Sequence, residues 1–348
     1  MSLPPRDWGR AEVVALRDLS TTVREFTLRP ETPMKPPSAG SHLRVQVVHA
    51  DARLDERRYS LVGLPAADGH WRIAVKRAAP SRGGSAFMWR LAVGDTVKVL
   101  PPDNHFELPP TPLPTLLVAG GIGITPILGM ALTLAGRNSA LRMAYAARSD
   151  DELVYRDELE AALGSRLRCF VDARGERLDL EAEIAALPAN GQLLVCGPVP
   201  LLHAAQAAWA RAGRPPQRLR FETFGNTGAL PTEAFRVVLA RHGLAFDVPA
   251  DRSLLEMLEE RGVQCLADCL RGECGLCAVD ILSLDGRIDH RDVFFSATEK
   301  ADSRRLCACV SRAVGNGQTP ARLVIDSAWR PDTIEPRAVA ARGANAKL

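Results

Sequence analysis

The sequence has little net charge and no apolar segment at its amino-terminal end. Its 44 Lys and Arg residues are nearly balanced by 41 Asp and Glu residues, which gives a formal net charge of +3. Because the basic residues are scattered rather than clustered, we expect no nucleic-acid partner. The start of the chain, MSLPPRDWGR, lacks the apolar core of a signal peptide, so we expect a cytoplasmic protein.

The sequence also lacks a convincing membrane span. Residues 108–136 carry no charged side chain and would be long enough to cross a bilayer. Five prolines and a Gly-Gly-x-Gly turn interrupt this stretch, and they would break a continuous helix. A linker, a buried strand, a glycine turn and a helix explain the composition better, so we expect no membrane contact.

Cysteine is missing from the first 168 residues, and six of the eight cysteines lie between positions 265 and 309. Without a secretory signal, such clustering favours metal ligation over disulfide bonds. Cys169 lies in an expected buried strand, where we interpret it as a core residue.

The chain divides into segments with different sequence patterns. Residues 1–110 contain many short strands separated by Gly, Pro and Asp, which predicts a closed antiparallel β-barrel. Residues 111–225 alternate buried strands and helices, which predicts an α/β domain with a parallel sheet. A Gly-containing linker, 226–232, leads to a third domain, 233–327, with a hairpin, a helix and the cysteine loop. Residues 328–348 show no periodicity and are expected to form a disordered tail.

The cysteine loop has the spacing C-x4-C-x2-C at Cys269, Cys274 and Cys277. Plant-type ferredoxins use this spacing, together with a distant fourth cysteine, to hold a 2Fe–2S cluster. Gly272 and Gly275 would let the backbone approach the inorganic sulfides, so that its N–H groups can bond to sulfur. The pattern therefore predicts an iron–sulfur site.

The fourth ligand stays open on these residues, since Cys307 and Cys309 are both at a suitable distance along the chain. A structural zinc site is the main alternative, but zinc sites prefer paired C-x2-C units or His partners. Inert buried thiols are a further alternative. A Rieske cluster is excluded by ligand type, because no Cys-x-His pair occurs.

The run LLVAGGIGITPIL, 116–128, predicts a strand, a glycine turn and a helix whose amides face the diphosphate of a nicotinamide nucleotide. We expect Thr125 to cap this helix and Pro126 to take its first position. The motif is not G-x-G-x-x-G, and a buried turn without a ligand is the alternative. The candidate residues are Gly120, Gly121, Gly123, Thr125 and Pro126.

Two other expected strand ends support a nucleotide site, because open α/β sheets bind ligands at the carboxyl ends of their strands. Arg148 ends one strand, and Cys196, Gly197 and Pro198 end another. Arg148 would favour the 2′-phosphate of NADPH, whereas an aspartate at 150 or 151 would accept a hydrogen bond from the free ribose of NADH. The sequence leaves this choice open.

A flavin site is predicted within the barrel segment. Arg57 offers a bidentate fork for a phosphate, Tyr59 a flat face for the ring system and Ser60 a hydroxyl donor. The segments IAVKR (73–77) and SRGGS (81–85) follow, and small residues and amides there would bind a second edge of the phosphate. An ordinary surface strand is the alternative for the first motif. The further candidate contacts are Ala74, Lys76, Gly83, Gly84 and Ser85.

The motifs R-x-Y-S, RGGS, GGIGITP, CGP and C-x4-C-x2-C occur in the order found in phthalate dioxygenase reductase and vanillate O-demethylase reductase. The chain resembles this family over residues 10–326. The resemblance implies an antiparallel β-barrel flavin domain, an α/β parallel-sheet nucleotide domain and a β-grasp-like α+β ferredoxin domain. It implies FMN in preference to FAD, because no additional adenosine-binding segment is recognisable.

The resemblance also bears on individual residues. In the family, the last cluster cysteine directly precedes a segment like VSRA, 310–313, which selects Cys309 as the fourth ligand over Cys307. The Cys-Ala-Cys pair and the longer gap depart from the family pattern. FETF, 221–224, resembles the family segment that places an aromatic side chain near the flavin, and this suggests Phe224.

Together the motifs predict an enzyme that transfers electrons from NAD(P)H through a flavin and a 2Fe–2S cluster. We assign no catalytic side chain, because the cofactors supply the chemistry, although Phe224 and Cys196 would lie near the flavin and the nicotinamide. The resemblance implies a terminal Rieske-type oxygenase as partner and NADH as donor, and we expect a monomer. A stand-alone reductase of small acceptors is the main alternative, and a redox-sensing regulator is another.

Overall fold

The computed structural model describes residues 8–34, 36–78, 81, 83–109, 112–224, 230–317 and 319–327. The chain separates into two compact units, Met1–Phe224 and Gly225–Leu348. Most of the predicted linker, 226–229, and the whole predicted tail, 328–348, lie outside the described residues. Among the described helices, none has the length and hydropathy needed to cross a bilayer.

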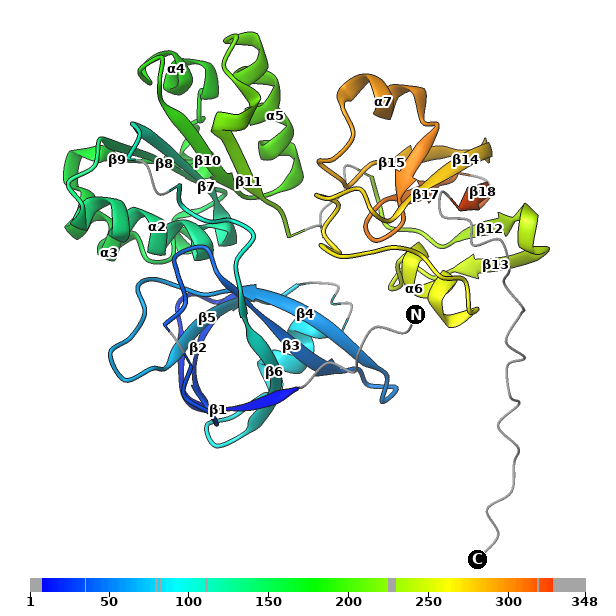
Figure 1. The fold of residues 1–348 in the computed structure, drawn as a ribbon, viewed down its shortest axis with the longest axis horizontal. Coiled ribbons are helices and arrows are strands. Elements are labelled where there is room, and N and C mark those ends of the chain that lie inside the picture. Colours follow the sequence, from blue (N-terminus) through cyan, green and yellow to red (C-terminus); the bar gives the residue numbers. More distant parts are fainter. Residues whose placement is uncertain are drawn as a thin grey trace, which may run out of the picture. The chain divides into compact units, whose positions relative to one another are not determined.

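The first half of the first unit is a six-stranded antiparallel sheet with the strand order β4-β3-β6-β1-β2-β5 (Figure 1). An isolated bridge between Leu61, just after β4, and Ile73 of β5 closes the sheet into a barrel. Alternating side chains of the strands fill its interior, and Phe26, Leu43 and Ile73 are fully buried. The elements are β1 (Gly9–Asp18), β2 (Val23–Pro30), β3 (His42–Val48), β4 (Leu54–Ser60), β5 (Trp71–Lys76), α1 (Gly84–Arg90) and β6 (Thr96–Asp103).

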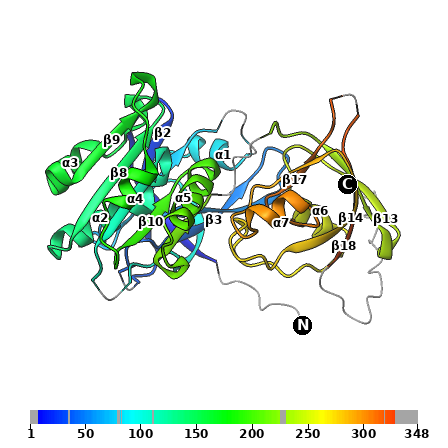
Figure 2. The same cartoon turned by 90° about the horizontal axis from the view of Figure 1, so that it is seen from above.

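The second half of this unit is a five-stranded parallel sheet with the order β11-β10-β7-β8-β9. Helices α2 and α3 lie on one face of the sheet, and α4 and α5 on the other (Figures 1 and 2). Every residue of β7 is buried, as expected for a parallel strand covered on both faces. The elements are β7 (Thr115–Gly120), α2 (Ile124–Gly136), β8 (Leu141–Ala147), α3 (Arg156–Leu163), β9 (Leu167–Val171), α4 (Leu180–Ala185), β10 (Gln192–Cys196), α5 (Val199–Arg211) and β11 (Leu219–Glu222).

The second unit is a mixed five-stranded sheet with the order β13-β12-β18-β14-β16, plus the small pair β15-β17. Its outer hairpin turns at Gly243, which has φ +60, and Ser253 and Glu256 form a capping box that starts α6. The elements are β12 (Phe235–Leu239), β13 (Leu244–Val248), α6 (Leu254–Glu260), β14 (Ala278–Asp285), β15 (Arg287–Asp289), α7 (Ala297–Asp302), β16 (Arg305–Cys307), β17 (Arg312–Val314) and β18 (Arg322–Ser327).

Candidate electron-transfer sites

The cysteine loop of the second unit has a tightly constrained backbone. Leu270, Gly272 and Gly275 all have positive φ, at +52, +73 and +73. A Cβ atom on Gly272 would lie 2.8 Å from Cα of Asp292, and one on Gly275 would lie 2.3 Å from Cζ of Phe294. Both predicted glycines are therefore required by left-handed backbone and by close packing.

Backbone N–H groups of the loop point at the sulfur of Cys269. Those of Arg271, Glu273 and Cys274 lie 3.4, 3.3 and 3.4 Å from it. A hydrogen bond from the thiol of Cys309 and these three N–H groups together lower the pKa of Cys269 to about 4. A thiolate is thus favoured at this position, and a thiolate is the form that binds iron.

The described thiols also distinguish the two candidates for the fourth ligand. The sulfur of Cys309 lies 3.1 Å from that of Cys277, and its thiol also bonds to Cys269. Cys307 is the last residue of β16, opposite Ala278, and its thiol bonds to Cys277. Hydrogen bonds from Cys307 and Cys309 lower the pKa of Cys277 to about 4. Donation of its own thiol to Cys269 and Cys277, followed by burial, raises the pKa of Cys309. Cys309 therefore joins two of the loop cysteines, and an all-sulfur donor set with N–H donors around it fits a 2Fe–2S cluster.

The glycine turn of the first unit meets the Cys-Gly-Pro segment at one edge of the parallel sheet. Strand β7 runs beside β10, with Ala119 opposite Cys196. A Cβ atom on Gly123 would lie 2.2 Å from the carbonyl oxygen of Cys196, and one on Gly120 would lie 2.8 Å from Cδ of Pro198. The structure thus brings the two predicted nucleotide motifs into direct contact.

The predicted capping role of Thr125 is wrong. Helix α2 begins at Ile124, and its N-cap is Gly123, without a side-chain hydrogen bond. The glycine turn is itself a short 3₁₀ helix, Gly121–Gly123, that runs directly into α2, so no extended residue precedes the helix. The hydroxyl of Thr125 instead donates to the carbonyl of Ile122 at 3.0 Å, inside the turn. Pro126 likewise comes after the first helical position.

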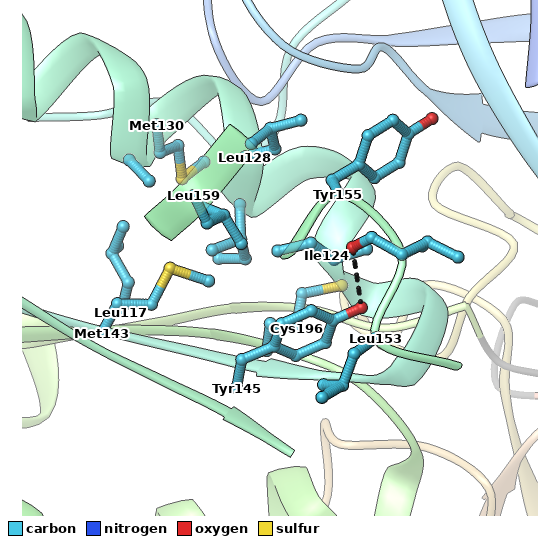
Figure 3. Close-up of a cluster of buried hydrophobic side chains, with 14 of the residues drawn as sticks. Leu117, Ile124, Leu128, Met130, Met143, Tyr145, Leu153, Tyr155, Leu159 and Cys196 are labelled. Carbon is cyan, nitrogen blue, oxygen red and sulfur yellow. Dashed lines mark hydrogen bonds between the residues drawn. The ribbon is translucent and has the colours of Figure 1, made fainter. Parts of the chain in front are cut away.

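A buried core anchors the glycine turn to the loop that follows β8 (Figure 3). The hydroxyl of Tyr145 lies 3.3, 3.1 and 3.3 Å from the carbonyl oxygens of Gly121, Glu152 and Val154. Burial raises the pKa of Tyr145, so its hydroxyl stays protonated and can donate. Beyond the strand, the side chain of Arg148 is exposed, and Asp150 forms an ion pair with Arg174.

In the barrel, the structure brings the R-x-Y-S and R-G-G-S motifs together. A Cβ atom on Gly84 would lie 2.6 Å from Nε of Arg57, so the guanidinium lies against the start of α1. Arg57 also pairs with Asp55 at 2.6 Å. Burial raises the pKa of Tyr59, which keeps its phenol neutral. Ser85 accepts a hydrogen bond from the backbone N–H of Ala78 at 3.2 Å.

Three of the predicted cofactor-binding residues, Ser60, Lys76 and Phe224, lie where the barrel meets the parallel-sheet domain. The hydroxyl of Ser60 donates to Glu222 at 2.9 Å, and both residues are buried. Lys76, at the end of β5, pairs with Glu152 at 2.5 Å. Phe224 is partly buried and packs against the core that also contains Ala74.

Comparison with known proteins supports both halves of this description. Residues 237–314 match the family model of the 2Fe-2S iron-sulfur cluster binding domain, and residues 117–207 match that of the oxidoreductase NAD-binding domain. The heme-dependent oxidative N-demethylase beta subunit of Ectopseudomonas mendocina is 37% identical over 306 residues, which cover 87% of this chain and 96% of that protein. Tetrachlorobenzoquinone reductase of Sphingobium chlorophenolicum is 35% identical, over 90% and 96% of the two chains.

Among solved structures, the chain is similar to phthalate dioxygenase reductase, described as a modular structure for electron transfer from pyridine nucleotides to [2Fe-2S]. The two share 31% identity and a TM-score of 0.70, over 92% of this chain and 98% of that one. The chain belongs to the phthalate dioxygenase reductase family. The family, the fold class and the electron-transfer function predicted from the motifs are thereby confirmed.

The reductase is therefore the NAD(P)H-dependent component of an oxygenase or demethylase system. It passes electrons from the nicotinamide through a flavin to the 2Fe–2S cluster, and from there to the oxygenase component. The individual cofactor contacts and the domain boundaries remain predictions.

Sequence reasoning missed two carboxylates of the reductase. Glu222 is 1% exposed at the end of β11, a strand that the sequence analysis did not predict. Its signal was an acidic residue placed between the two phenylalanines of FETF. Glu152 gave no comparable signal, because its role depends on Lys76 of a different domain.

Proposed function

We propose that the reductase uses NADH and FMN, and that its electron acceptor is a terminal Rieske-type oxygenase. The observation that carries the proposal is the convergence of Cys269, Cys277 and Cys309 in one hydrogen-bonded thiol group, with Cys274 donating its N–H to the same site. A cluster held there would accept one electron at a time, which matches an iron oxygenase better than a two-electron acceptor.

Two features support FMN in preference to FAD. Arg57 lies against Gly84 at the start of α1, where a cation and backbone amides would both face a terminal phosphate. No further segment that would bind an adenosine is recognisable in the sequence. When bound, the flavin supplies the exchange between a two-electron donor and a one-electron acceptor. The chain's own residues would bind and orient the flavin. Burial keeps the phenol of Tyr59 neutral, and the hydroxyl of Ser60 is fixed by its hydrogen bond to Glu222.

The choice of NADH rests on the acidic residues that follow β8. Asp150 and Asp151 begin the short 3₁₀ helix Asp150–Glu152, where a carboxylate can accept a hydrogen bond from a free 2′-hydroxyl. An ion pair with Arg174 partly neutralises the charge of Asp150. Arg148, the residue that would favour NADPH, is exposed two positions earlier in the sequence. Stopped-flow reduction of the flavin by NADH and by NADPH would test the choice, and equal limiting rates and apparent Kd values for the two nucleotides would contradict it.

The experiment that tests the acceptor is reconstitution of the full chain with purified partners. Anaerobically purified reductase is analysed for iron, sulfide and the released flavin, and then supplied with NADH and a Rieske-type oxygenase. We expect substrate turnover that depends on all three components. Turnover with a heme-containing demethylase but not with a Rieske-type oxygenase would overturn the Rieske assignment.

A small-acceptor reductase is the second candidate, and the similarity to tetrachlorobenzoquinone reductase favours it. The two candidates differ in their need for the cluster. Cys277→Ser should stop electron delivery to the oxygenase, whereas a reductase acting on quinones directly from its flavin would keep its quinone activity. Unchanged oxygenase turnover in this variant would contradict the relay.

We predict that limited proteolysis divides the reductase within 225–232, between its two compact units. A protease would release a fragment of the second unit that keeps its cluster absorbance, because the described sheets pair strands within each unit alone. Mass spectrometry of the fragments gives the cleavage site. A linker that resists cleavage while other loops are cut would argue against independent domains.

The cluster loop and its surroundings expose several large apolar side chains, which we expect to contact the oxygenase. Leu266, Leu270, Leu276 and Phe294 are 51, 38, 50 and 45% exposed. Leu266→Glu should raise the KM for the oxygenase about tenfold, which corresponds to about 1.4 kcal/mol, because a charge would be desolvated on docking.

The matched control is Leu282→Glu, which adds the same charge at a side chain of β14 that is 57% exposed. Ferricyanide reduction should be unchanged in both variants. Equal KM values for Leu266→Glu and Leu282→Glu would exclude a docking role for the first position.

A further inference from the structure

A buried carboxylate lies beneath the cysteine loop of the second unit. Asp292 is 0% exposed and belongs to the segment between β15 and α7. Its Oδ1 accepts a hydrogen bond from the hydroxyl of Ser311 at 3.1 Å, and its Oδ2 accepts one from the N–H of Phe295 at 3.0 Å. Burying a carboxylate is costly, so its retention requires partners that satisfy both oxygens.

The side chains of Lys300 and His290 lie close to Asp292 and compensate its negative charge. Nζ of Lys300 donates to the carbonyl of Asp292 at 2.6 Å and lies 3.7 Å from its Oδ2. Nδ1 of His290 lies 3.4 Å from its Oδ1. Burial alone would raise the pKa of Asp292, but the bonds from His290 and the N–H of Phe295, with the charge of Lys300, hold it below its usual value. Asp292 is therefore an acceptor-only group.

Asp292 contacts the three-cysteine loop directly. The N–H of Val293 donates to the carbonyl of Gly272 at 2.9 Å. A Cβ atom on Gly272 would lie 2.8 Å from Cα of Asp292 and 2.7 Å from Cγ2 of Val310. Gly272 therefore lies where the loop, the Asp292 segment and the residue after Cys309 all meet.

Asp292 also holds the segment that carries the fourth cysteine. Ser311 donates a hydrogen bond from its hydroxyl to Asp292. This serine is two residues beyond Cys309 and is 1% exposed. The oxygen of the same hydroxyl accepts the N–H of Arg291 at 3.2 Å, so Ser311 is held by two consecutive residues of the Asp292 segment. The two parts of the predicted ligand set thus meet at Asp292, whose carboxylate holds Ser311 and whose Cα and Cβ pack against Gly272, although they are more than 30 residues apart in sequence.

We propose that Asp292 is a positioning residue that holds the three-cysteine loop and the Cys309 segment at the spacing the cluster requires. The inference rests on the proposed set of four cysteine ligands. Asp292 would act through Ser311 and Gly272, without touching iron or sulfide. Groups that orient metal ligands in this way contribute about 10–100-fold to metal affinity or activity when they are removed.

The test uses Asp292→Asn, Ser311→Ala and the double variant in the full-length holoprotein. An asparagine has nearly the same shape, but its NH₂ group must face either the Phe295 N–H, where a donor would meet a donor, or the Ser311 hydroxyl, which would then have to accept a hydrogen bond instead of donating one. Cluster loss is followed as bleaching of the visible absorbance in the presence of an iron chelator. We expect about tenfold faster loss in Asp292→Asn and a smaller increase in Ser311→Ala. The double variant should be no worse than Asp292→Asn, because both act through one hydrogen bond.

Glu299→Gln is the matched control, since it removes a carboxylate of the same region that lies on an exposed helix cap. It should leave the rate of cluster loss unchanged. The EPR g-values of the reduced cluster separate positioning from general stability, because only a change in ligand geometry would shift them. We expect shifted g-values in Asp292→Asn and wild-type values in Glu299→Gln.

Wild-type g-values and a wild-type rate of cluster loss in Asp292→Asn would overturn the inference. If the wild-type protein itself assembles no 2Fe–2S cluster, the proposed ligand set fails instead, and the two failures are therefore distinguishable. Should Asp292→Asn not fold, Ser311→Ala alone must still accelerate cluster loss, and the inference falls if it does not.

Discussion

Cys309→Ser is expected to prevent assembly of the 2Fe–2S cluster, whereas Cys307→Ser should keep it. The thiol of Cys309 bonds to both Cys269 and Cys277, so its sulfur lies where a fourth ligand would complete the set. Without it, one iron would lack a thiolate. Electron delivery to cytochrome c or to the oxygenase should then fall at least about 100-fold, because losing a ligand costs more than losing an outer-shell partner, for which 100-fold is the upper end of the range.

Iron and sulfide analysis with EPR of the reduced protein measures the cluster directly. Ferricyanide reduction by NADH should persist in Cys309→Ser, because the first unit contains the nucleotide and flavin motifs without the cysteine loop. Cys307 is fully buried in β16, so Cys307→Ser serves as the control for loss of a neighbouring thiol. A cluster present in Cys309→Ser and missing from Cys307→Ser would reverse the assignment.

Gly123→Ala should nearly abolish reduction of the flavin by NADH. A Cβ atom at this position would lie 2.2 Å from the carbonyl oxygen of Cys196, and a backbone carbonyl cannot turn aside as a flexible side chain can. The glycine turn and the Cys-Gly-Pro segment would have to separate by roughly 1 Å, a displacement that can cost about 100-fold in rate. Stopped-flow measurement of flavin bleaching gives the rate.

Gly136→Ala is the control for this substitution. Gly136 is the last residue of α2, and among the described residues no atom lies within 4 Å of where its Cβ would be. This variant should reduce its flavin at the wild-type rate and gain slightly in helix stability. Both variants should bind flavin and assemble the cluster. A wild-type rate in Gly123→Ala would show that the nucleotide does not depend on this edge of the sheet.

The nucleotide motif shows how far local sequence reasoning reaches. Its glycines predicted a turn at the end of a buried strand, and the structure has that turn between β7 and α2. Helix-cap rules assigned Thr125 to the cap, but the turn continues as a 3₁₀ helix into α2, and Thr125 bonds inside it. The local preference was overridden because Gly123 must pack against Cys196 of another strand.

The flavin motifs show a different limit. Arg57 and Gly84 belong to different motifs and are 27 positions apart, and the R-x-Y-S motif alone is compatible with an ordinary surface strand. Closure of the barrel brings them together. Ser60 and Glu222 are buried hydrogen-bond partners from different domains. The sequence around either residue gives no sign of the other one.

The sequence by itself determined the order of the modules, the three-cysteine loop and its glycines, and the reaction class, because each depends on spacings within a few consecutive residues. The tertiary structure decided which cysteine meets the loop, that Asp292 joins its two parts, and that Glu222 and Glu152 reach the barrel. These are contacts between segments far apart in the chain, and their geometry exists only once the sheets have formed and packed.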